Sequence, residues 1–373
     1  MKILVITKRQ YMAKDLLDDR FGRFRELPLE LAALGHQVAG ICLSYRRRKE
    51  GSYTDAAERG GEVLWQSLNL GGLILPGLVH HMRRCLATIE AFRPDIIWAA
   101  SDSYHAIVGA WLGKRTRTKY VVDLYDNFES FGMTRLPGVL RLLKRAVRSA
   151  DGVTCVSRPL LDYVIRAYRP PGPACVLENG IRQDLFNARD RRACRKDLGL
   201  PENARIIGTA GALTRSRGIE SLFGAFAKLA AENESLHLAL AGAHDRRTPI
   251  PNGARIHYLG ALPLERVPIL INALDVAVVC NRDSLFGRYN FPQKAYEIIA
   301  CGTPIVAAAV GSMKELFAAH PECLFDAEYP ESLALTVKRQ LEKPTNVNVK
   351  APGWSEQAAR LEQFLLKVVE ARP

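Results

Sequence analysis

Short apolar segments alternate with amphipathic segments along the whole chain, and this alternation restricts the fold more than any other feature. The apolar segments have the length of strands, and the segments between them have helical periodicity. Parallel strands need a crossover connection, usually a helix, so the pattern predicts an α/β fold with parallel sheets. The expected strands form two series: Lys2–Thr7, His36–Leu43, Asp95–Ala99, Lys119–Leu124, Gly152–Val156 and Cys175–Leu177, then Ile206–Thr209, Leu236–Ala241, Ile256–Leu259, Val276–Cys280, Ile305–Ala309 and Cys323–Phe325.

The polar stretch between the two series predicts a division into two Rossmann-like domains. We place an N-terminal domain at residues 1–185, a linker at 186–204 and a C-terminal domain at 205–350. A last helix, residues 354–370, is expected to cross back onto the N-terminal domain. With 373 residues, of which 48% are hydrophobic, the chain is long enough to bury two cores.

The segment Phe286–Ala307 is the part most informative about function. Pro292 stands where a first helical turn accepts proline, and Gly302 stands where helices commonly end. The apolar run Ile305–Val310 then has the length of a strand. We therefore expect a helix that begins at about Phe291, whose first N–H groups are free to bind an anion such as a diphosphate.

Lys294, expected one turn into this helix, adds a positive charge, and Glu297, one turn later, is placed to accept hydrogen bonds from a hydroxyl. The stretch resembles the donor-sugar motif of retaining glycosyltransferases of family 4, in which the glutamate holds the ribose of a nucleotide sugar. The matching residues are Pro292, Lys294, Glu297, Ala300, Gly302 and Pro304.

The chain departs from the more familiar form of this motif at one position. That form has a second glutamate where this chain has Tyr289. The resemblance therefore implies that Tyr289, Asn290 or the backbone recognises the sugar hydroxyls, and that Gln293 also lies at the donor.

The segment Gly208–Glu220 resembles the first strand and loop of the same family's donor domain. There a basic residue just before a glycine binds the diphosphate, and Arg217 matches it. Ala212 replaces a second arginine of the family, which leaves Arg215 as a substitute. Glycines such as Gly211 let the backbone approach phosphate, and a guanidinium neutralises a leaving diphosphate without a metal. We therefore expect no metal and no cofactor besides the nucleotide-sugar substrate.

The N-terminal domain is expected to bind the acceptor. Gly22 ends a loop, and Arg23 and Arg25 beside it favour an anionic acceptor or a second contact to the diphosphate, although a solvated basic loop fits equally well. Asp126 follows a buried strand, at the end where open α/β sheets bind ligands, and is a candidate to orient or deprotonate the acceptor hydroxyl. Many family members have a histidine in this region, which this chain lacks.

Net charge is unevenly distributed. The chain carries +13 in all, and residues 1–180 contain 27 Lys and Arg against 18 Asp and Glu. Leu136–Arg148 alternates apolar and basic residues at helical spacing, which suits either an anionic membrane surface or a packed helix with a solvated basic face. Nucleic acid is not an expected partner, because the charge accompanies no RNP-like, zinc-finger or helix-turn-helix pattern.

Cysteine usage and the N-terminus predict a cytoplasmic location. The eight cysteines show neither metal-ligand nor redox spacing, as in reduced cytosolic proteins, and the first apolar run is too short for a signal peptide. The basic helix adds the expectation of a peripheral position on the inner face of the cytoplasmic membrane.

Taken with the resemblance, these features predict the GT-B architecture, in which two Rossmann-like domains face each other across a cleft. The expected activity is that of a retaining hexosyltransferase, moving a sugar from a UDP- or GDP-sugar to a hydroxyl of a lipid-linked or other glycan precursor of lipopolysaccharide or exopolysaccharide type. Retention is inferred from the family alone. Two alternatives stay open: an enzyme like UDP-N-acetylglucosamine 2-epimerase, and a non-catalytic binding subunit of the same fold.

Overall fold

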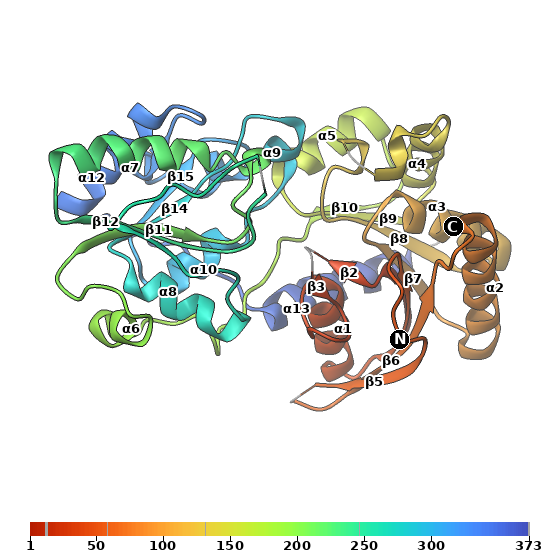
Figure 1. The fold of residues 1–373 in the computed structure, drawn as a ribbon. Helices are drawn as coiled ribbons and strands as arrows, with labels where there is room; N and C mark the ends of the chain where they lie inside the picture. Colours follow the sequence, from red (N-terminus) through yellow and green to blue (C-terminus); the bar gives the residue numbers. More distant parts are fainter. Residues whose placement is uncertain (12–13, 58, 131, 246, 372–373) are drawn as a thin grey trace. The chain divides into compact units, whose positions relative to one another are not determined.

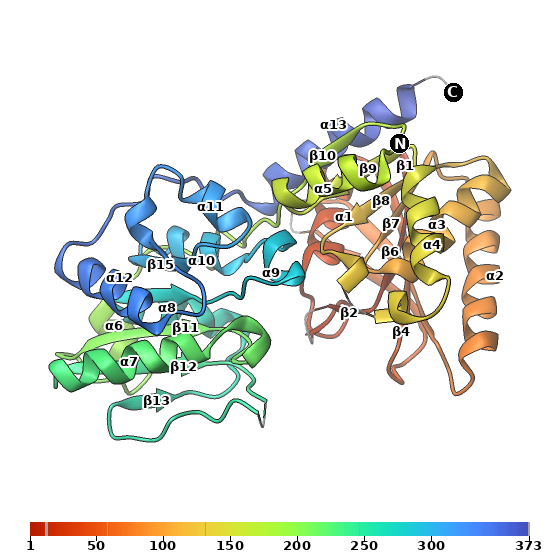
Figure 2. The ribbon, with the colours of Figure 1, turned by 90° about the horizontal axis from the view of Figure 1, so that it is seen from above.

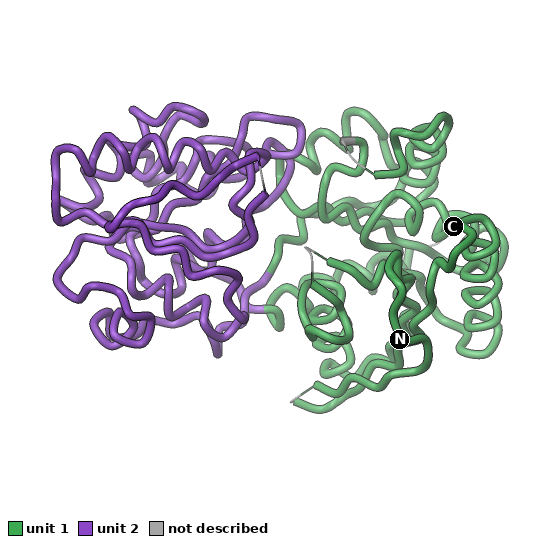
Figure 3. Tube along the Cα trace, in the orientation of Figure 1, with its two compact units in different colours: residues 1–179, 354–373 green, residues 180–353 purple. Residues whose placement is uncertain are grey.

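The computed structural model describes residues 1–11, 14–57, 59–130, 132–245 and 247–371, which form two compact units (Figures 1 and 3). Unit 1 consists of Met1–Asn179 and Trp354–Pro373, and unit 2 consists of Gly180–Gly353. Each unit is built on its own predominantly parallel sheet, covered by helices on both faces. The prediction of an α/β fold with two Rossmann-like domains is therefore confirmed.

Unit 1 has an eight-stranded sheet in the order β10-β9-β8-β7-β1-β4-β6-β5. All neighbours pair in parallel except β5, which is antiparallel to β6. The strands are β1 (Lys2–Lys8), β4 (Gln37–Ser44), β5 (Gly51–Ala56), β6 (Glu62–Asn69), β7 (Ile96–Ala100), β8 (Lys119–Leu124), β9 (Gly152–Cys155) and β10 (Ala174–Val176), and a separate short pair comprises β2 (Gln10–Tyr11) and β3 (Lys14–Asp15).

The helices of unit 1 cover the two faces of this sheet. Figure 2 shows α2, α3 and α4 on one face and α1 on the other, where α13 packs against it. No helix in the described part of the chain is both long enough and apolar enough to cross a bilayer. The helices are α1 (Arg23–Ala33), α2 (Ile74–Phe92), α3 (Ser103–Thr116), α4 (Val139–Arg148), α5 (Arg158–Tyr168) and α13 (Trp354–Glu370), with 3₁₀ turns η1 (Phe128–Ser130) and η2 (Gly132–Arg135).

The edge strands β5 and β6 are absent from the sequence prediction. Along the start of β6, exposed and buried residues alternate, because this part of the strand has one face toward solvent. Trp65, on β6, is fully buried, and its ring lies against Gly40 of β4. A Cβ atom at position 40 would come within 2.2 Å of that ring. The absence of a side chain at Gly40 therefore makes room for the tryptophan in the core.

Unit 2 has a six-stranded parallel sheet in the order β13-β12-β11-β14-β15-β16. In Figure 1, α7 and α12 cover one face, and α6, α8 and α10 cover the other. The strands are β11 (Arg205–Ala210), β12 (Leu236–Ala241), β13 (Ile256–Tyr258), β14 (Val276–Val279), β15 (Ile305–Ala308) and β16 (Leu324–Phe325). The helices are α6 (Arg191–Asp197), α7 (Glu220–Glu232), α8 (Val267–Ala273), α9 (Leu285–Tyr289), α10 (Lys294–Ala300), α11 (Ser312–Leu316) and α12 (Pro330–Glu342), with 3₁₀ turns η3 (Arg215–Arg217), η4 (Leu264–Arg266) and η5 (Pro321–Cys323).

The segment predicted as a linker, residues 186–204, is instead part of unit 2. It contains α6, which packs against α8, and its Arg195 is buried with Nη2 2.7 Å from a carboxylate oxygen of Asp275. Ile181 forms an isolated parallel bridge with Gly353. The chain therefore enters unit 2 after residue 179, and residues 180–185 of the predicted N-terminal domain belong to unit 2.

A buried ion pair joins the first helix of unit 1 to its sheet. Arg23 and Asp123 are both fully buried, with Arg23 Nη2 2.9 Å from Asp123 Oδ1. Nη1 of the same guanidinium donates to Asn179 Oδ1 at 2.9 Å, and Thr154 Oγ1 donates to Asp123 at 2.6 Å. Burial raises the pKa of Asp123, while Arg23 acts in the opposite direction. The arginine thus compensates a carboxylate that water cannot reach.

Removing this arginine should strongly destabilise unit 1. Arg23→Ala leaves Asp123 unpaired in the interior, so the free energy of unfolding should fall by about 3–5 kcal/mol. Urea unfolding followed by tryptophan fluorescence measures this, because all four tryptophans lie in unit 1.

Arg20→Ala provides a matched control, since the side chain of Arg20 is exposed and Asp55, its partner, also pairs with Arg25. Its cost should stay under about 1 kcal/mol. Equal losses in the two variants would contradict the importance of the buried pair.

Candidate active site

Two glycines at strand ends form the floor of a site in unit 2. Gly211 follows β11 with a φ of 124°, and its N–H donates to the carbonyl of Ala241 at 2.8 Å. Gly242, after β12, lies so close that a Cβ atom there would be 1.7 Å from the carbonyl oxygen of Gly211. The two strand ends therefore pack backbone to backbone, and Gly211 remains exposed to a ligand.

Lys294 lies directly over this floor. A Cβ atom at Gly211 would be 3.1 Å from Lys294 Nζ. The lysine is the first residue of α10, so the predictions that the helix begins at about Phe291 and that Lys294 lies one turn in are corrected by this structure. Gln293, just before the helix, donates from Nε2 to Glu297 Oε1 at 3.2 Å. Lys294 and Glu297 are three residues apart and so share one side of the helix.

Arg217 reaches the site from η3 and is held by residues that follow β14. Its guanidinium carbon lies 4.5 Å from the ring centroid of Phe286, in a cation–π contact. The side-chain amide of Asn290 lies 3.2 Å from Arg217 Nη1. In the amide orientation that satisfies the surrounding hydrogen-bond partners, the Asn290 side-chain oxygen accepts from this nitrogen. Ser312 Oγ in turn donates to the backbone carbonyl of Asn290 at 3.0 Å. These contacts fix the direction of the guanidinium.

Loss of water around the charges shifts the pKa values of Lys294 and Glu297 in α10. Burial, together with the positive charge of Arg217, lowers the pKa of Lys294 to about 8. Burial raises the pKa of Glu297 to about 7, although Lys294 and Gln293 act in the opposite direction. Both residues therefore change charge near neutral pH, as is common in functional sites.

Other predicted donor residues of unit 2 have contacts that the sequence does not indicate. Arg215 is exposed, with Nε 3.3 Å from a carboxylate oxygen of Glu220, so its guanidinium already has a partner. Tyr289 is the last residue of α9, a short helix absent from the sequence prediction, and is half-buried. Asn281 was missed: it is buried and donates from Nδ2 to the carbonyl of Gly287 at 3.2 Å, which holds α9 to the end of β14.

In unit 1, Asp126 lies just beyond β8, as predicted, and is buried. Its Oδ1 accepts the N–H of Asn127 at 2.8 Å. Lys8 at the end of β1 donates from Nζ to the hydroxyl of Tyr125 at 3.0 Å. Burial lowers the pKa of Lys8, while Asp126 and a second carboxylate, Asp102, act in the opposite direction. Ends of different strands thus bring an ammonium near two carboxylates.

Asp102 is held by two side chains that the sequence analysis missed as partners. The Tyr45 hydroxyl donates to Asp102 Oδ2 at 2.7 Å, and His105 Nδ1 lies 2.7 Å from Oδ1. Burial raises the pKa of Asp102, but His105 and Lys8 lower it by more, so this pKa lies below its usual range. No sequence signal pairs Tyr45 with this carboxylate.

The residues predicted to bind an acceptor near the first helix have structural roles instead. Gly22 has a φ of 96° and packs on Tyr11, whose ring a Cβ atom would approach to 2.3 Å. Arg23 is enclosed in the ion pair described above. Arg25 is buried and makes two hydrogen bonds to Asp55, at 2.6 and 2.9 Å. These arginines compensate internal carboxylates and are not available to an anionic acceptor.

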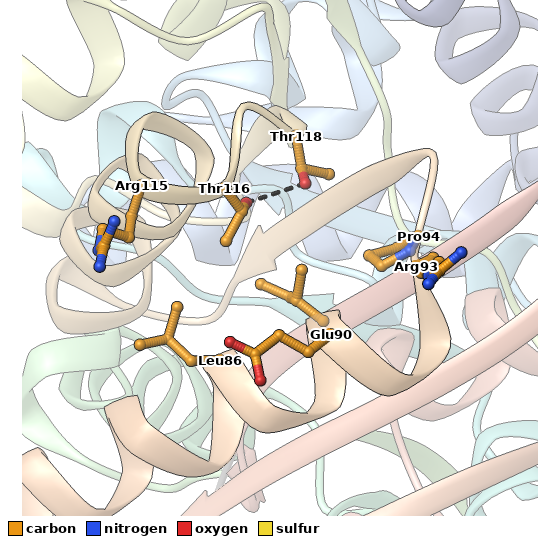
Figure 4. A pocket seen from close by; sticks show the side chains of 8 residues that line it. Leu86, Glu90, Arg93, Pro94, Arg115, Thr116 and Thr118 are labelled. Atoms are coloured by element: carbon orange, nitrogen blue, oxygen red, sulfur yellow. Dashed lines mark hydrogen bonds between the residues drawn. The ribbon is translucent and has the colours of Figure 1, made fainter.

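A surface hollow of about 630 Å³ lies between the C-terminal ends of α2 and α3 (Figure 4). It lies where these helices turn into β7 and β8, at the opposite end of the sheet from Lys8, Asp102 and Asp126. It is therefore separate from the polar cluster of unit 1. Its lining residues are Leu86, Ile89, Glu90, Arg93, Pro94, Arg115, Thr116 and Thr118.

Family models match most of the chain. A glycosyl transferase 4-like domain matches residues 23–180, and the glycosyl transferases group 1 model matches residues 190–360. The chain belongs to the family 4 glycosyltransferases. The resemblance to this family is thus confirmed over both halves of the chain.

Curated relatives of this glycosyltransferase are about one quarter identical to it. A D-inositol 3-phosphate glycosyltransferase of Stackebrandtia nassauensis is 27% identical over 46% of this chain and 41% of its own length. A Bacillus subtilis glycosyltransferase named for teichuronic acid biosynthesis is 26% identical, over 69% and 66%. D-inositol 3-phosphate glycosyltransferase 2 of Catenulispora acidiphila is 27% identical, over 77% and 73%. The alignments with the first two thus span less than two thirds of those relatives.

Solved structures similar to this glycosyltransferase establish its fold. A sucrose-phosphate synthase from Thermosynechococcus elongatus superposes with a TM-score of 0.72 at 20% identity, covering 98% of this chain and 96% of that one. Anabaena HepE, solved in complex with UDP, gives 0.68 at 20% identity, covering 99% and 97%. This likeness agrees with the predicted GT-B fold.

The charges around Lys294 should control its proton affinity in opposite directions. Arg217→Gln removes a positive charge and should raise the pKa of Lys294 above about 8, whereas Glu297→Gln removes a nearby carboxylate and should lower it further. An NMR titration of lysine labelled at Cε measures both changes.

Arg205→Gln is the control for this titration, because Arg205 is an exposed arginine at the other end of β11. It should leave the titration of Lys294 unchanged. A shift in the same direction for Arg217→Gln and Glu297→Gln would contradict the arrangement of charges described here.

Proposed function

We propose that this glycosyltransferase transfers a hexose from a UDP- or GDP-sugar, with retention of configuration, to a hydroxyl of a glycan precursor of lipopolysaccharide or exopolysaccharide type. The observation that carries the proposal is the grouping of Arg217, Lys294 and Glu297 around the exposed backbone of Gly211 in unit 2. Two cations and a carboxylate beside open backbone match the chemistry of a nucleotide sugar, which has an anionic diphosphate next to a ribose diol.

The diphosphate would bind over Gly211. The ammonium of Lys294 is already at this glycine, and the contacts with Phe286 and Asn290 hold the guanidinium of Arg217. Glu297, on the same helix side as Lys294, accepts hydrogen bonds from the ribose hydroxyls. Similar solved structures support this choice of donor, because Anabaena HepE was solved with UDP, with UDP and glucose, and with UDP-glucose.

The proposed reaction breaks the bond between the anomeric carbon and the diphosphate oxygen. Negative charge then grows on the leaving diphosphate, and Arg217 and Lys294 stabilise it more strongly in the transition state than in the substrate. The acceptor oxygen bonds to the same face of the anomeric carbon, and its proton passes to the leaving diphosphate. Positive side chains thereby supply the charge stabilisation that Mg²⁺ provides in other transferases, so we propose that the reaction needs no metal.

The acceptor hydroxyl is assigned to the polar cluster of unit 1. Asp126 and Asp102 are hydrogen-bond acceptors at strand ends, and Tyr45 and Lys8 supply donors there. Such a mixture suits the hydroxyls of a sugar. We propose that Asp126 orients the acceptor hydroxyl, and the Bacillus relative named for teichuronic acid biosynthesis supports a glycan as the acceptor class.

A nucleotide-sugar panel tests the proposed function. Thermal shift should identify a UDP- or GDP-sugar as the ligand, because a ligand at a hundred times its Kd stabilises by about 2.7 kcal/mol. Turnover should then require a glycan acceptor. Conversion of the nucleotide sugar to its epimer without acceptor, or binding without turnover across the panel, would overturn the proposal in favour of an epimerase or a binding subunit.

Glu297→Ala should weaken donor binding. Loss of hydrogen bonds to a charged acceptor should cost about 1.5–3 kcal/mol, roughly a ten- to hundredfold rise in Kd measured by calorimetry. The control Glu342→Ala removes an exposed carboxylate at the end of α12 and should leave Kd unchanged. Unchanged affinity in folded Glu297→Ala would remove this residue from the donor site.

Arg217→Ala and Lys294→Ala should each lower kcat by roughly one to three orders of magnitude, because both stabilise charge that develops in the transition state. Initial rates at saturating donor measure this, with Lys228→Ala on the exposed side of α7 as the control. Activity of the parent protein should also survive EDTA. A requirement for Mg²⁺ would contradict the role given to these two side chains.

A further inference from the structure

The first turn of α2 exposes apolar side chains to an unusual degree. Leu73 just before the helix is 72% exposed, Ile74 61%, Leu75 75% and Val79 47%. Farther along, α2 buries a narrow stripe consisting of His81, Cys85 and Ile89. The start of the helix therefore projects an apolar surface that unit 1 itself does not cover.

A basic loop lies beside this apolar turn. Arg46–Lys49 connects β4 to β5, and all four residues are exposed. Arg48 N donates to Asn69 Oδ1 at 3.0 Å, and Asn69 Nδ2 donates to the Arg48 carbonyl at 2.6 Å. Asn69 ends β6, four residues before Leu73. The loop and the turn are therefore joined through the same strand end.

The charges around the apolar turn are predominantly positive, with Glu50, which accepts the N–H of Asn69 at 2.7 Å, as an acidic residue beside the loop. Arg46, Arg47 and Lys49 come from the loop, and Arg83 follows Val79 by four residues on the same side of α2. Arg48 is partly neutralised, since its guanidinium lies 3.5 Å from Asp15 and 3.9 Å from Asp18. Glu90, near the end of α2, is the first acidic residue of that helix.

We propose that this α2 docking surface, made of Leu73–Leu75, Val79, Arg46, Arg47, Lys49 and Arg83, binds an anionic lipid bilayer. Apolar side chains at a projecting helix start can enter the acyl boundary, while the surrounding cations meet lipid phosphates. Charge complementarity thus selects a negatively charged membrane over a neutral one.

The basic helix singled out in the sequence, α4, is less suited to this role. Leu143, Ala146 and Val147 are buried, so the apolar side of α4 packs into unit 1. Lys144 Nζ lies 3.8 Å from Glu129, and Arg148 Nε donates to the Tyr168 carbonyl at 3.2 Å. The exposed remainder of the Leu136–Arg148 segment consists mainly of arginines, with Leu136 and Leu142 as its strongly exposed apolar side chains. The structure therefore shifts the expected membrane contact from α4 to α2.

Docking through α2 goes beyond the proposed transfer reaction and does not depend on it. It also bears on the acceptor, because Tyr45, directly before the basic loop, donates to Asp102 of the polar cluster. A bilayer at the loop would hold that cluster close to the headgroup layer. An acceptor anchored in the membrane by a lipid would then present its hydroxyls to these residues.

Sedimentation with vesicles tests the proposal on the full chain without substrates. The parent protein should sediment with phosphatidylcholine vesicles that contain phosphatidylglycerol and not with phosphatidylcholine alone. High salt should release it, as the Debye length falls from about 10 Å at 0.1 M to about 3 Å at 1 M. Failure to bind the anionic vesicles would overturn the proposal, whether or not the transferase activity is found.

Three variants locate the contact. Leu73→Ser with Ile74→Ser and Leu75→Ser should lower the partition coefficient at least tenfold, and Arg46→Gln with Arg47→Gln and Lys49→Gln about a hundredfold. The α4 control, Arg141→Gln with Arg145→Gln, removes two exposed charges and should bind within about threefold of the parent. Tryptophan fluorescence verifies folding. Normal binding by the α2 variant, or loss confined to the α4 variant, would overturn the assignment.

Discussion

Parallel strands connected through helices must all end at the same edge of their sheet, and both polar clusters depend on this constraint. In unit 2 the ends of β11 and β12 bring Gly211 and Gly242 together, although they are far apart in the chain. In unit 1 the ends of β1 and β8 place Lys8 beside Tyr125. The apolar strands that hold each unit together therefore also determine which polar residues meet.

The same constraint explains which strands the sequence predicts. A parallel strand covered on both faces reads as a continuous apolar run, so β1, β7, β8, β11, β12 and β14 are found from sequence. The β5–β6 edge is missed because part of it faces solvent and mixes polar with apolar residues. The start of α10 is misplaced by a few residues, because Pro292 and Gln293 are also compatible with a turn before the helix.

Sequence periodicity does not determine which charged side chains form ion pairs with each other in the folded chain. Arg23 and Arg25 stand beside a glycine in a loop, where basic residues suggest an anion site, yet their partners are Asp123 and Asp55, far along the chain. The carboxylate opposite a given arginine depends on register and helix packing. The motif around Lys294 and Glu297 is more predictable, because its geometry is local to one helix and needs only the helical repeat.

The local site combines charges that are unfavourable until a ligand arrives. Lys294 and Arg217 repel each other in a partly dehydrated space, which contributes to a pKa of about 8 for the lysine. A diphosphate placed between them would replace repulsion by attraction and raise that pKa, so binding near pH 8 would draw a proton onto Lys294. As the leaving diphosphate gains charge, the attraction increases further. In the proposed mechanism, the repulsion between Lys294 and Arg217 would therefore favour the most negative species along the reaction, which is the condition for catalysis by differential binding.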